Sequence, residues 1–274
     1  MTEPLVSVCI PTFNGSRFLK QTIQSVLSQT YTNIEVLISD HSSSDETVTI
    51  INSFSDPRLS LIVLGSGGSA SDNWNNAVVN ARGKYVKLIC QDDILKKNCI
   101  QEQVRALEEH PDASFCFSPR DIVSPGGRRI IRSRGWKPAN DVVLLEDELS
   151  TVIRSGTNPF GEPCSVLIRE SALKSVGRYE GSYLIDFNMC MKLWSTAPAI
   201  FLNKSLSQFR ISNSSWTSKL VGQQAQQMSQ KYLELCKNFP TLICTADTEM
   251  GIRQAKKLES KRMVLTKIIS LLHI

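Results

Sequence analysis

The stretch SVCIPTFNGSRFLKQTIQSVLSQTYTNIEVLISD, residues 7–40, decides the fold class. An apolar run, Leu5–Ile10, leads into it and ends at Pro11 and a glycine-containing turn. Apolar residues then recur at the spacing of one helical face, at Leu19, Ile23, Val26 and Leu27. A second run, 34–38, alternates apolar and polar residues up to Asp40, which is typical of a strand. The stretch therefore predicts strand, helix and strand, the repeating unit of a parallel α/β sheet.

The same alternation continues to about residue 118. Further strands are predicted at 59–64, 85–89, 113–118 and 165–168. Helices are predicted at 45–51, 72–82, 100–107, 170–176, from Asp186 to 194, at 217–237 and at 245–272. Between 120 and 158 the pattern changes to a turn flanked by apolar pairs, followed by a less regular region, which indicates an antiparallel or mixed extension. We predict an α/β fold with a Rossmann-like, doubly wound, mostly parallel sheet, a mixed extension and C-terminal helices.

Composition narrows the class of function. With 274 residues, 41% hydrophobic and 21% charged, the chain has the composition of a globular protein with one substantial core. Eight cysteines form no CxxC pair, and only three histidines are present, so we expect reduced core cysteines and neither a zinc site nor a histidine-dependent triad. Carboxylates must then supply most of the acid, base or metal chemistry. No apolar run approaches the roughly 18 residues that span a bilayer, and we expect a cytoplasmic protein.

The net charge of +5 lies in the C-terminal tail, where residues 251–274 hold six Lys or Arg against one Glu. No aromatic residues are interleaved with these charges, so we expect no nucleic-acid partner. The last helix has an apolar stripe, made up of Leu258, Leu265, Ile269 and Leu272. Two interpretations stay open: packing on its own domain or on a second copy in a homodimer, and peripheral docking on an anionic membrane at the inner face of the cell membrane.

Acidic and hydroxyl residues end three of the predicted strands. Thr12 follows the first, Asp40 closes the second, and Asp92 and Asp93 follow the run that begins at Tyr85. The carboxyl ends of parallel strands meet at one edge, where ligands of open α/β sheets bind. Adjacent carboxylates repel each other, and a divalent cation or sugar hydroxyls can offset that repulsion. We therefore expect a metal-bound nucleotide diphosphate there; the alternative is that these residues cap turns and helices.

Two segments, SVCIPTFNGSRFLKQTIQSVLSQTYTNIEVLISDHSSSDET (7–47) and ARGKYVKLICQDD (81–93), resemble the N-terminal half of family 2 glycosyltransferases with the GT-A fold. The resemblance is close over residues 5–118 and looser over 161–196. It implies a GT-A catalytic domain at 1–212, with a nucleotide-binding half at 1–118 and an acceptor-side half at 119–212. Residues 213–274 then form a C-terminal helical region.

The resemblance also implies site residues. Asp40 would accept the N3 hydrogen of uracil or thymine, Asp92 would hold the ribose, and Asp93 would bind Mg²⁺ or Mn²⁺ on the diphosphate. The full set of implied nucleotide-binding residues is Pro11, Thr12, Asn14, Asp40, Asn75 and Asp92.

The catalytic base implied by the resemblance is Asp186, in YLIDFNMCMKLW (183–194). A base that takes the acceptor's proton works best with a pKa near neutral, and the apolar neighbours of Asp186 would raise its pKa from about 4. A helix N-terminus would lower it. The alternative is an ordinary aspartate that opens a helix.

We predict an inverting glycosyltransferase that moves a sugar from a UDP- or dTDP-sugar to a hydroxyl of a glycan or lipid-linked saccharide in surface-polysaccharide synthesis. Cys90 and Ile185 replace acidic residues that are frequent in the family, and a C-terminal histidine is missing, which favours a catalytically inactive binding module as one rival. The other rival is a sugar nucleotidyltransferase, but PTFNGSRF after the first strand lacks the basic, glycine-rich loop that cradles a triphosphate.

Overall fold

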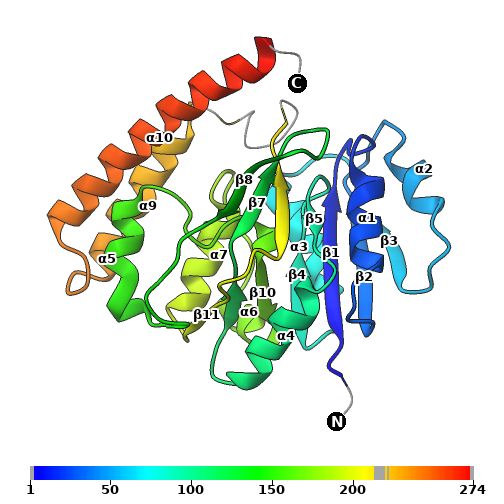
Figure 1. Cartoon of the computed structure of the whole chain (residues 1–274), viewed down its shortest axis with the longest axis horizontal. Helices are drawn as coiled ribbons and strands as arrows, with labels where there is room; N and C mark the ends of the chain where they lie inside the picture. The colour runs from blue at the N-terminus through cyan, green and yellow to red at the C-terminus, as the bar shows by residue number, and fades with distance from the viewer. Residues whose placement is uncertain (1–2, 213–219, 221, 272–274) are drawn as a thin grey trace.

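The computed structural model describes residues 3–212, 220 and 222–271, with side chains up to residue 264. Its main sheet has the strand order β3-β2-β1-β4-β10-β6-β11-β9, with helices on both faces (Figure 1). The strands are β1 Val6–Thr12, β2 Ile34–Asp40, β3 Leu59–Val63, β4 Tyr85–Leu88, β6 Phe115–Phe117, β9 Val142–Val143, β10 Val166–Arg169 and β11 Ala199–Phe201. The prediction of a doubly wound α/β fold is confirmed.

The first four strands form the predicted parallel half. β1 pairs in parallel with both β2 and β4, and β2 pairs in parallel with β3. The crossovers run through α1 Leu19–Leu27, α2 Thr47–Asn52 and α3 Ala70–Val79. Because Thr12 and Asp40 are register partners at the last position of the β1–β2 ladder, they reach the same edge of the sheet.

The sheet becomes mixed earlier than the sequence pattern indicates. β10 lies between β4 and β6 and is antiparallel to both, so a strand from residue 166 onward separates two strands of the N-terminal half. About fifty residues of chain separate β10 from β6, the strand that follows α4 Cys99–Glu109. This insertion brings the turn before β10, the 3₁₀ turn η1 Pro163–Ser165, next to β4.

A second sheet has the order β5-β12-β7-β8. Its strands are β5 Ile94–Leu95, β7 Arg120–Val123, β8 Arg129–Arg134 and β12 Ser207–Arg210. β7 and β8 form the antiparallel hairpin that the turn at 125–127 predicts. β12 pairs with β5, which follows the Asp92–Asp93 pair directly, so the strand at 207–210 folds back onto that pair.

The region predicted to be less regular contains a helix, α5 Leu145–Ser155. Leu149, Val152 and Ile153 are buried on one face, and Gly156 ends the helix in the left-handed conformation at φ 67°. Three acidic residues occupy its first turn, where the helix dipole favours them. The sequence prediction was wrong here because the apolar face is short and lies between irregular segments.

Two apolar clusters, one on each face of the main sheet, form the core. β1 and β2 are buried along their whole length, with Val8 in one cluster and Cys9 in the other. The remaining helices are α6 Glu170–Val176, α7 Ile185–Trp194, α9 Gln224–Asn238 and α10 Thr245–Leu271. Five of the eight cysteines are buried, and all eight are free thiols, as predicted.

The C-terminal helices α9 and α10 pack beside α5 at one end of the molecule (Figure 1). Tyr232 of α9 and Ala255 of α10 belong to the same apolar cluster as Ile153 of α5. These helices therefore bury apolar side chains against their own chain. Leu258 is half-buried; Leu265, Ile269 and Leu272, the rest of the predicted stripe, lie outside the residues whose side chains are described. Among the helices described, none combines the length and apolar character needed to cross a membrane.

Candidate active site at the edge of the main sheet

The ends of β1 and β2 are joined by side chains. Thr12 Oγ1 donates to Asp40 Oδ1 at 3.0 Å, and the same carboxylate accepts hydrogen bonds from the hydroxyl (2.6 Å) and backbone N–H (2.9 Å) of Ser43. Asn73 of α3 bridges both strands, because its Nδ2 donates to the Thr12 carbonyl at 3.0 Å and its Oδ1 accepts from Ser39 at 2.6 Å. Asp40 thus does shape the following turn, as the alternative interpretation held, and it is also fixed in place at the carboxyl edge of the sheet.

The loop after β1 is held by two partners. Asn14, at φ 47°, accepts a hydrogen bond on Oδ1 from the Ser44 N–H at 2.9 Å, so its amide anchors the next loop. Gln91 pairs with the backbone of Phe13, accepting from its N–H at 2.8 Å and donating to its carbonyl at 3.1 Å. Pro11 lies within β1, opposite Ser39. Gln91 was not among the predicted site residues, although it directly precedes the carboxylate pair.

Residues of α1 and β12 hold the Asp92–Asp93 pair in place. Thr22 of α1 donates to the Asp93 carbonyl at 2.8 Å, and the backbone N–H of Arg210 donates to Asp93 Oδ1 at 3.2 Å. The Arg210 guanidinium donates to the Asp92 carbonyl at 3.0 Å and lies over the Phe18 ring. Burial raises the pKa of both carboxyls, and the charge of Asp92 raises that of Asp93 further.

One side-chain oxygen of Asp93 receives no hydrogen bond from the described residues. Its side chain is fully buried, and within the described residues its Oδ2 has no hydrogen-bond partner. A buried carboxylate oxygen without a donor is costly unless a ligand completes it. A divalent cation bound by one or two carboxylates and by phosphate oxygens fits this atom and its neighbour Asp92. The described residues contain no cluster of three or more metal-ligating side chains, so the remaining ligands would come from substrate and water.

Asp186 lies in the first turn of α7. Asn158 Nδ2 donates to its Oδ2 at 3.0 Å, and the N–H of Phe187 donates to its Oδ1 at 2.8 Å. Burial, followed by the nearby negative charge of Glu162, raises the pKa of Asp186 to about 7, although both hydrogen bonds act in the opposite direction. The expectation that its surroundings raise its pKa is thus supported, and such a carboxyl can exchange a proton near neutral pH.

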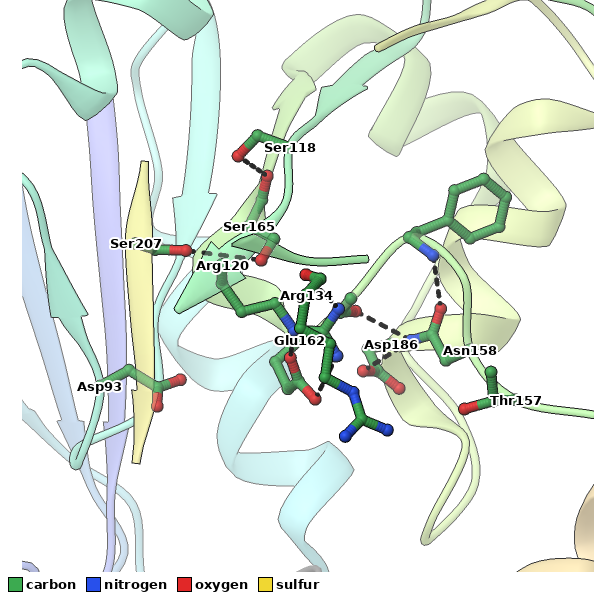
Figure 2. Close-up of polar contacts among 12 residues, drawn as sticks. Asp93, Ser118, Arg120, Arg134, Thr157, Asn158, Glu162, Ser165, Asp186 and Ser207 are labelled. Carbon is green, nitrogen blue, oxygen red and sulfur yellow. Dashed lines mark hydrogen bonds and ion pairs between the residues drawn. The ribbon is translucent and has the colours of Figure 1, made fainter. Parts of the chain in front are cut away.

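Glu162 lies between the two acidic centres. Figure 2 shows its carboxylate with Asp93 on one side and Asp186 on the other. Its charge raises the pKa of both aspartates. Arg120 of β7 holds it, with an ion pair and a hydrogen bond from Nη2 to Oε1 at 2.8 Å. The sequence offered no sign of Arg120 or Asn158, since each acts through a partner far along the chain.

Asn75 is the predicted site residue that lies apart from the rest. Its amide donates to the Tyr179 carbonyl and accepts from the Tyr179 N–H, both at 2.9 Å. It lines a cavity of about 830 Å³ between α3, α6 and the glycine-rich loop 65–68, and none of the other predicted residues lines that cavity. Asn75 therefore positions the chain before α7, and a role in nucleotide binding stays a prediction.

The sequence pattern of Glycosyl transferase family 2 matches residues 7–177, more than half of the chain. The chain belongs to this family. A glycosyltransferase of Rickettsia prowazekii, described as uncharacterized, is 26% identical over 228 residues, covering 81% of this chain and 68% of the relative. WfgD of Escherichia coli, named a UDP-Glc:alpha-D-GlcNAc-diphosphoundecaprenol beta-1,3-glucosyltransferase, is 32% identical over 124 residues, 45% of this chain. The match spans only about half of WfgD (49%).

Solved structures show the same fold. TarS of Staphylococcus aureus, in complex with UDP-GlcNAc, superposes with a TM-score of 0.67 at 18% identity, covering 91% of this chain and 71% of TarS. The mannosyltransferase PcManGT of Pyrobaculum calidifontis, in complex with GDP-Man and Mn²⁺, superposes with a TM-score of 0.65 at 15% identity, covering 99% of this chain and 76% of that one. Both are glycosyltransferases of the GT-A fold, so the fold that the sequence resemblance implied is confirmed.

Proposed function

We propose that this family member is a metal-dependent, inverting glycosyltransferase that transfers a sugar from a UDP- or dTDP-sugar to a hydroxyl of a glycan or a lipid-linked saccharide. One observation carries the proposal: Glu162 separates an incompletely bonded buried carboxylate, Asp93, from a carboxyl whose pKa is close to 7, Asp186. A transferase needs these two functions, one at the leaving diphosphate and one at the attacking hydroxyl.

The donor side is built from the strand ends. Asp40 is held by Thr12 and Ser43 with its carboxylate at the ligand edge, where it can accept an N–H from a pyrimidine ring. Asp92 and Asp93 follow β4 at the same edge and would hold the ribose and a Mg²⁺ or Mn²⁺ ion. When bound, the cation neutralises the charge that develops on the diphosphate. WfgD is named for a UDP-Glc donor, and TarS was solved in complex with UDP-GlcNAc, which supports this donor class.

The acceptor side is built from α7 and the turns before it. Asp186, deprotonated above its pKa, would take the proton of the attacking hydroxyl while Asn158 keeps the carboxylate oriented. Attack by the acceptor itself, with no protein nucleophile between, inverts the configuration at the sugar carbon. WfgD is named for a diphosphoundecaprenol-linked acceptor, which supports a lipid-linked saccharide here.

A lipid-linked acceptor would place the reaction at the cytoplasmic face of a membrane. The exposed cations of α10, Arg253, Lys256, Lys257 and Lys261, support a peripheral contact with anionic lipid. We include this peripheral membrane contact in the proposal, with a homodimer as the alternative.

Calorimetry with UDP, dTDP and GDP, each with and without Mn²⁺, tests the donor side. We expect metal-dependent binding of UDP or dTDP that is lost in Asp93→Asn and kept in Asp112→Asn, which removes an exposed carboxylate away from the site. Transfer of radiolabelled sugar to lipid-linked saccharides tests the acceptor side, and we expect it to depend on Asp186. A chain that binds no nucleotide is a binding module instead, and one that transfers sugar unchanged after Asp186→Asn uses another base.

A further inference from the structure

Three guanidinium groups gather around Glu162 and Asp186. They belong to Arg120 of β7, Arg134 at the end of β8 and Arg262 of α10. Arg120 is neutralised by its ion pair with Glu162. Neither of the other two forms an ion pair with a described residue, so the three arginines outnumber the two acidic side chains, Glu162 and Asp186, that they surround.

Arg134 is the arginine of this group whose side chain has no partner among the described residues. Its carbonyl accepts a hydrogen bond from Arg120 Nη1 at 3.1 Å, which fixes its backbone. Figure 2 shows its guanidinium extending past the Glu162 carboxylate on the side where Asp186 and Thr157 lie. Among the described residues, this guanidinium makes no hydrogen bond and no ion pair. Desolvation and the positive charge of Arg120 lower its pKa, whereas the charge of Glu162 acts in the opposite direction. The residue is exposed, so its guanidinium is accessible to a ligand.

Arg262 adds to the same positive field. Its Nη1 donates to the Tyr183 hydroxyl at 2.8 Å and to Gln224 Oε1 at 2.6 Å, and its Nη2 donates to Thr157 Oγ1 at 3.3 Å. These partners are neutral, and the described residues form no ion pair with Arg262. Thr157 precedes Asn158, the partner of Asp186, so the charge lies close to the proposed base.

We propose that Arg134, assisted by the charge of Arg262, binds an anionic group, a carboxylate or a phosphate, on the acceptor beside its reacting hydroxyl. A guanidinium presents paired N–H donors that match two oxygens of either group. The anion belongs to the acceptor because Asp93, at the donor diphosphate, lies on the opposite side of Glu162 in Figure 2. This inference rests on the proposed function for the assignment of the two sides, and it names the acceptor class that fits them.

The test is a titration of the full chain at constant ionic strength, with UDP present to fill the donor side. The probes are glucose 1-phosphate, glucuronate and neutral methyl glucoside. We expect at least one anion to bind in the millimolar range and methyl glucoside to bind at least fivefold more weakly. Arg134→Gln should weaken anion binding at least fivefold, whereas Arg132→Gln, which removes the same charge from another exposed position of the same strand, should leave it unchanged. The preferred anion distinguishes a phosphate-bearing acceptor from a uronic acid.

Three results overturn the proposal: neither anion binds, both bind Arg134→Gln as tightly as the unaltered chain, or Arg132→Gln weakens binding equally. Thermal unfolding of both variants excludes loss of fold as the cause. UDP binding in the same preparations is scored separately. Absence of UDP binding with intact, Arg134-dependent anion binding contradicts the glycosyltransferase proposal and leaves the anion site standing.

Discussion

Asn158 Nδ2 donates a 3.0 Å hydrogen bond to Asp186 Oδ2 and, at 2.9 Å, a second bond to the Gly161 carbonyl. The same side chain therefore orients the proposed base and holds the turn that leads to Glu162. Since the bond favours the charged carboxylate, it lowers the pKa of Asp186 against the larger effect of burial.

Asn158→Ala should move the acidic limb of the pH–activity profile to higher pH. Loss of the hydrogen bond raises the pKa of Asp186 above about 7, so more base is protonated at neutral pH. We expect a displacement of roughly 0.5–1 pH unit in the profile of kcat. Asn140→Ala, at an exposed position, is the control. An unmoved limb would mean that another group titrates in the profile.

Glu162→Gln should move the same limb in the opposite direction. Removing the negative charge lowers the pKa of Asp186, so the base stays ionised at lower pH. The variant leaves the buried Arg120 without its partner, and we expect a loss of about 3 kcal/mol in the free energy of unfolding. The pH profile should be recorded below the reduced Tm. A limb displaced to higher pH contradicts the placement of Glu162 beside Asp186.

Asp186→Asn should abolish transfer yet stabilise the fold at alkaline pH. The folded-state pKa of about 7 exceeds the unfolded value, so between about pH 4 and 7 the native state binds more protons and stability falls as pH rises. Asparagine lacks this penalty. We expect a Tm higher by about 2–4 °C at pH 8, corresponding to about 1 kcal/mol, and a much smaller difference at pH 4. A pH-independent difference in Tm would show that the raised pKa is not its source.

Arg210→Gln should weaken metal-dependent nucleotide binding and shift it to higher pH. The positive charge of Arg210 lowers the pKa of Asp92, and its guanidinium also donates to the Gln21 side chain and the Pro125 carbonyl. We expect a loss of roughly 2–4 kcal/mol in the free energy of unfolding, because the Arg210 side chain is itself buried and its partly buried acceptors lose their donor. Urea unfolding and UDP calorimetry between pH 5 and 8 measure the two effects. The exposed Arg128→Gln should change neither.

Gly83→Ala should destabilise the start of β4. A Cβ there would lie 2.6 Å from the Ser7 backbone nitrogen and 2.7 Å from the Leu5 carbonyl oxygen, and backbone atoms of a buried strand cannot move aside cheaply. We expect a loss of about 2–4 kcal/mol in urea unfolding. Gly126→Ala, in the β7–β8 turn, meets no heavy atom of the described residues within 4 Å and should be close to neutral. Equal effects of the two substitutions would contradict this packing.

The periodicity of apolar residues along the sequence was enough to predict the parallel half of the fold. The strand from residue 6, the helix face of Leu19 and Ile23, and the strand that ends at Asp40 all follow from periodicities of two and 3.6 residues. Since parallel strands end at one edge, the positions of Thr12, Asp40, Asp92 and Asp93 were also predictable from where their strands stop. α5 was missed because a short apolar face between irregular segments carries a weak pattern.

The chemistry of the site depends on contacts that no local pattern encodes. Arg210 reaches Asp93 across 117 residues because β12 pairs beside the carboxylate pair, and Glu162 stands between Asp93 and Asp186 because β10 enters the sheet antiparallel, next to β4. The sequence predicted a raised pKa for Asp186 from its apolar neighbours, but it gave no sign of the charged and hydrogen-bonding partners of the three carboxylates. Burial raises the pKa of all three carboxyls. Arg210 lowers that of Asp92, Glu162 raises those of Asp93 and Asp186, and Asn158 lowers that of Asp186. Only the folded chain brings these partners together.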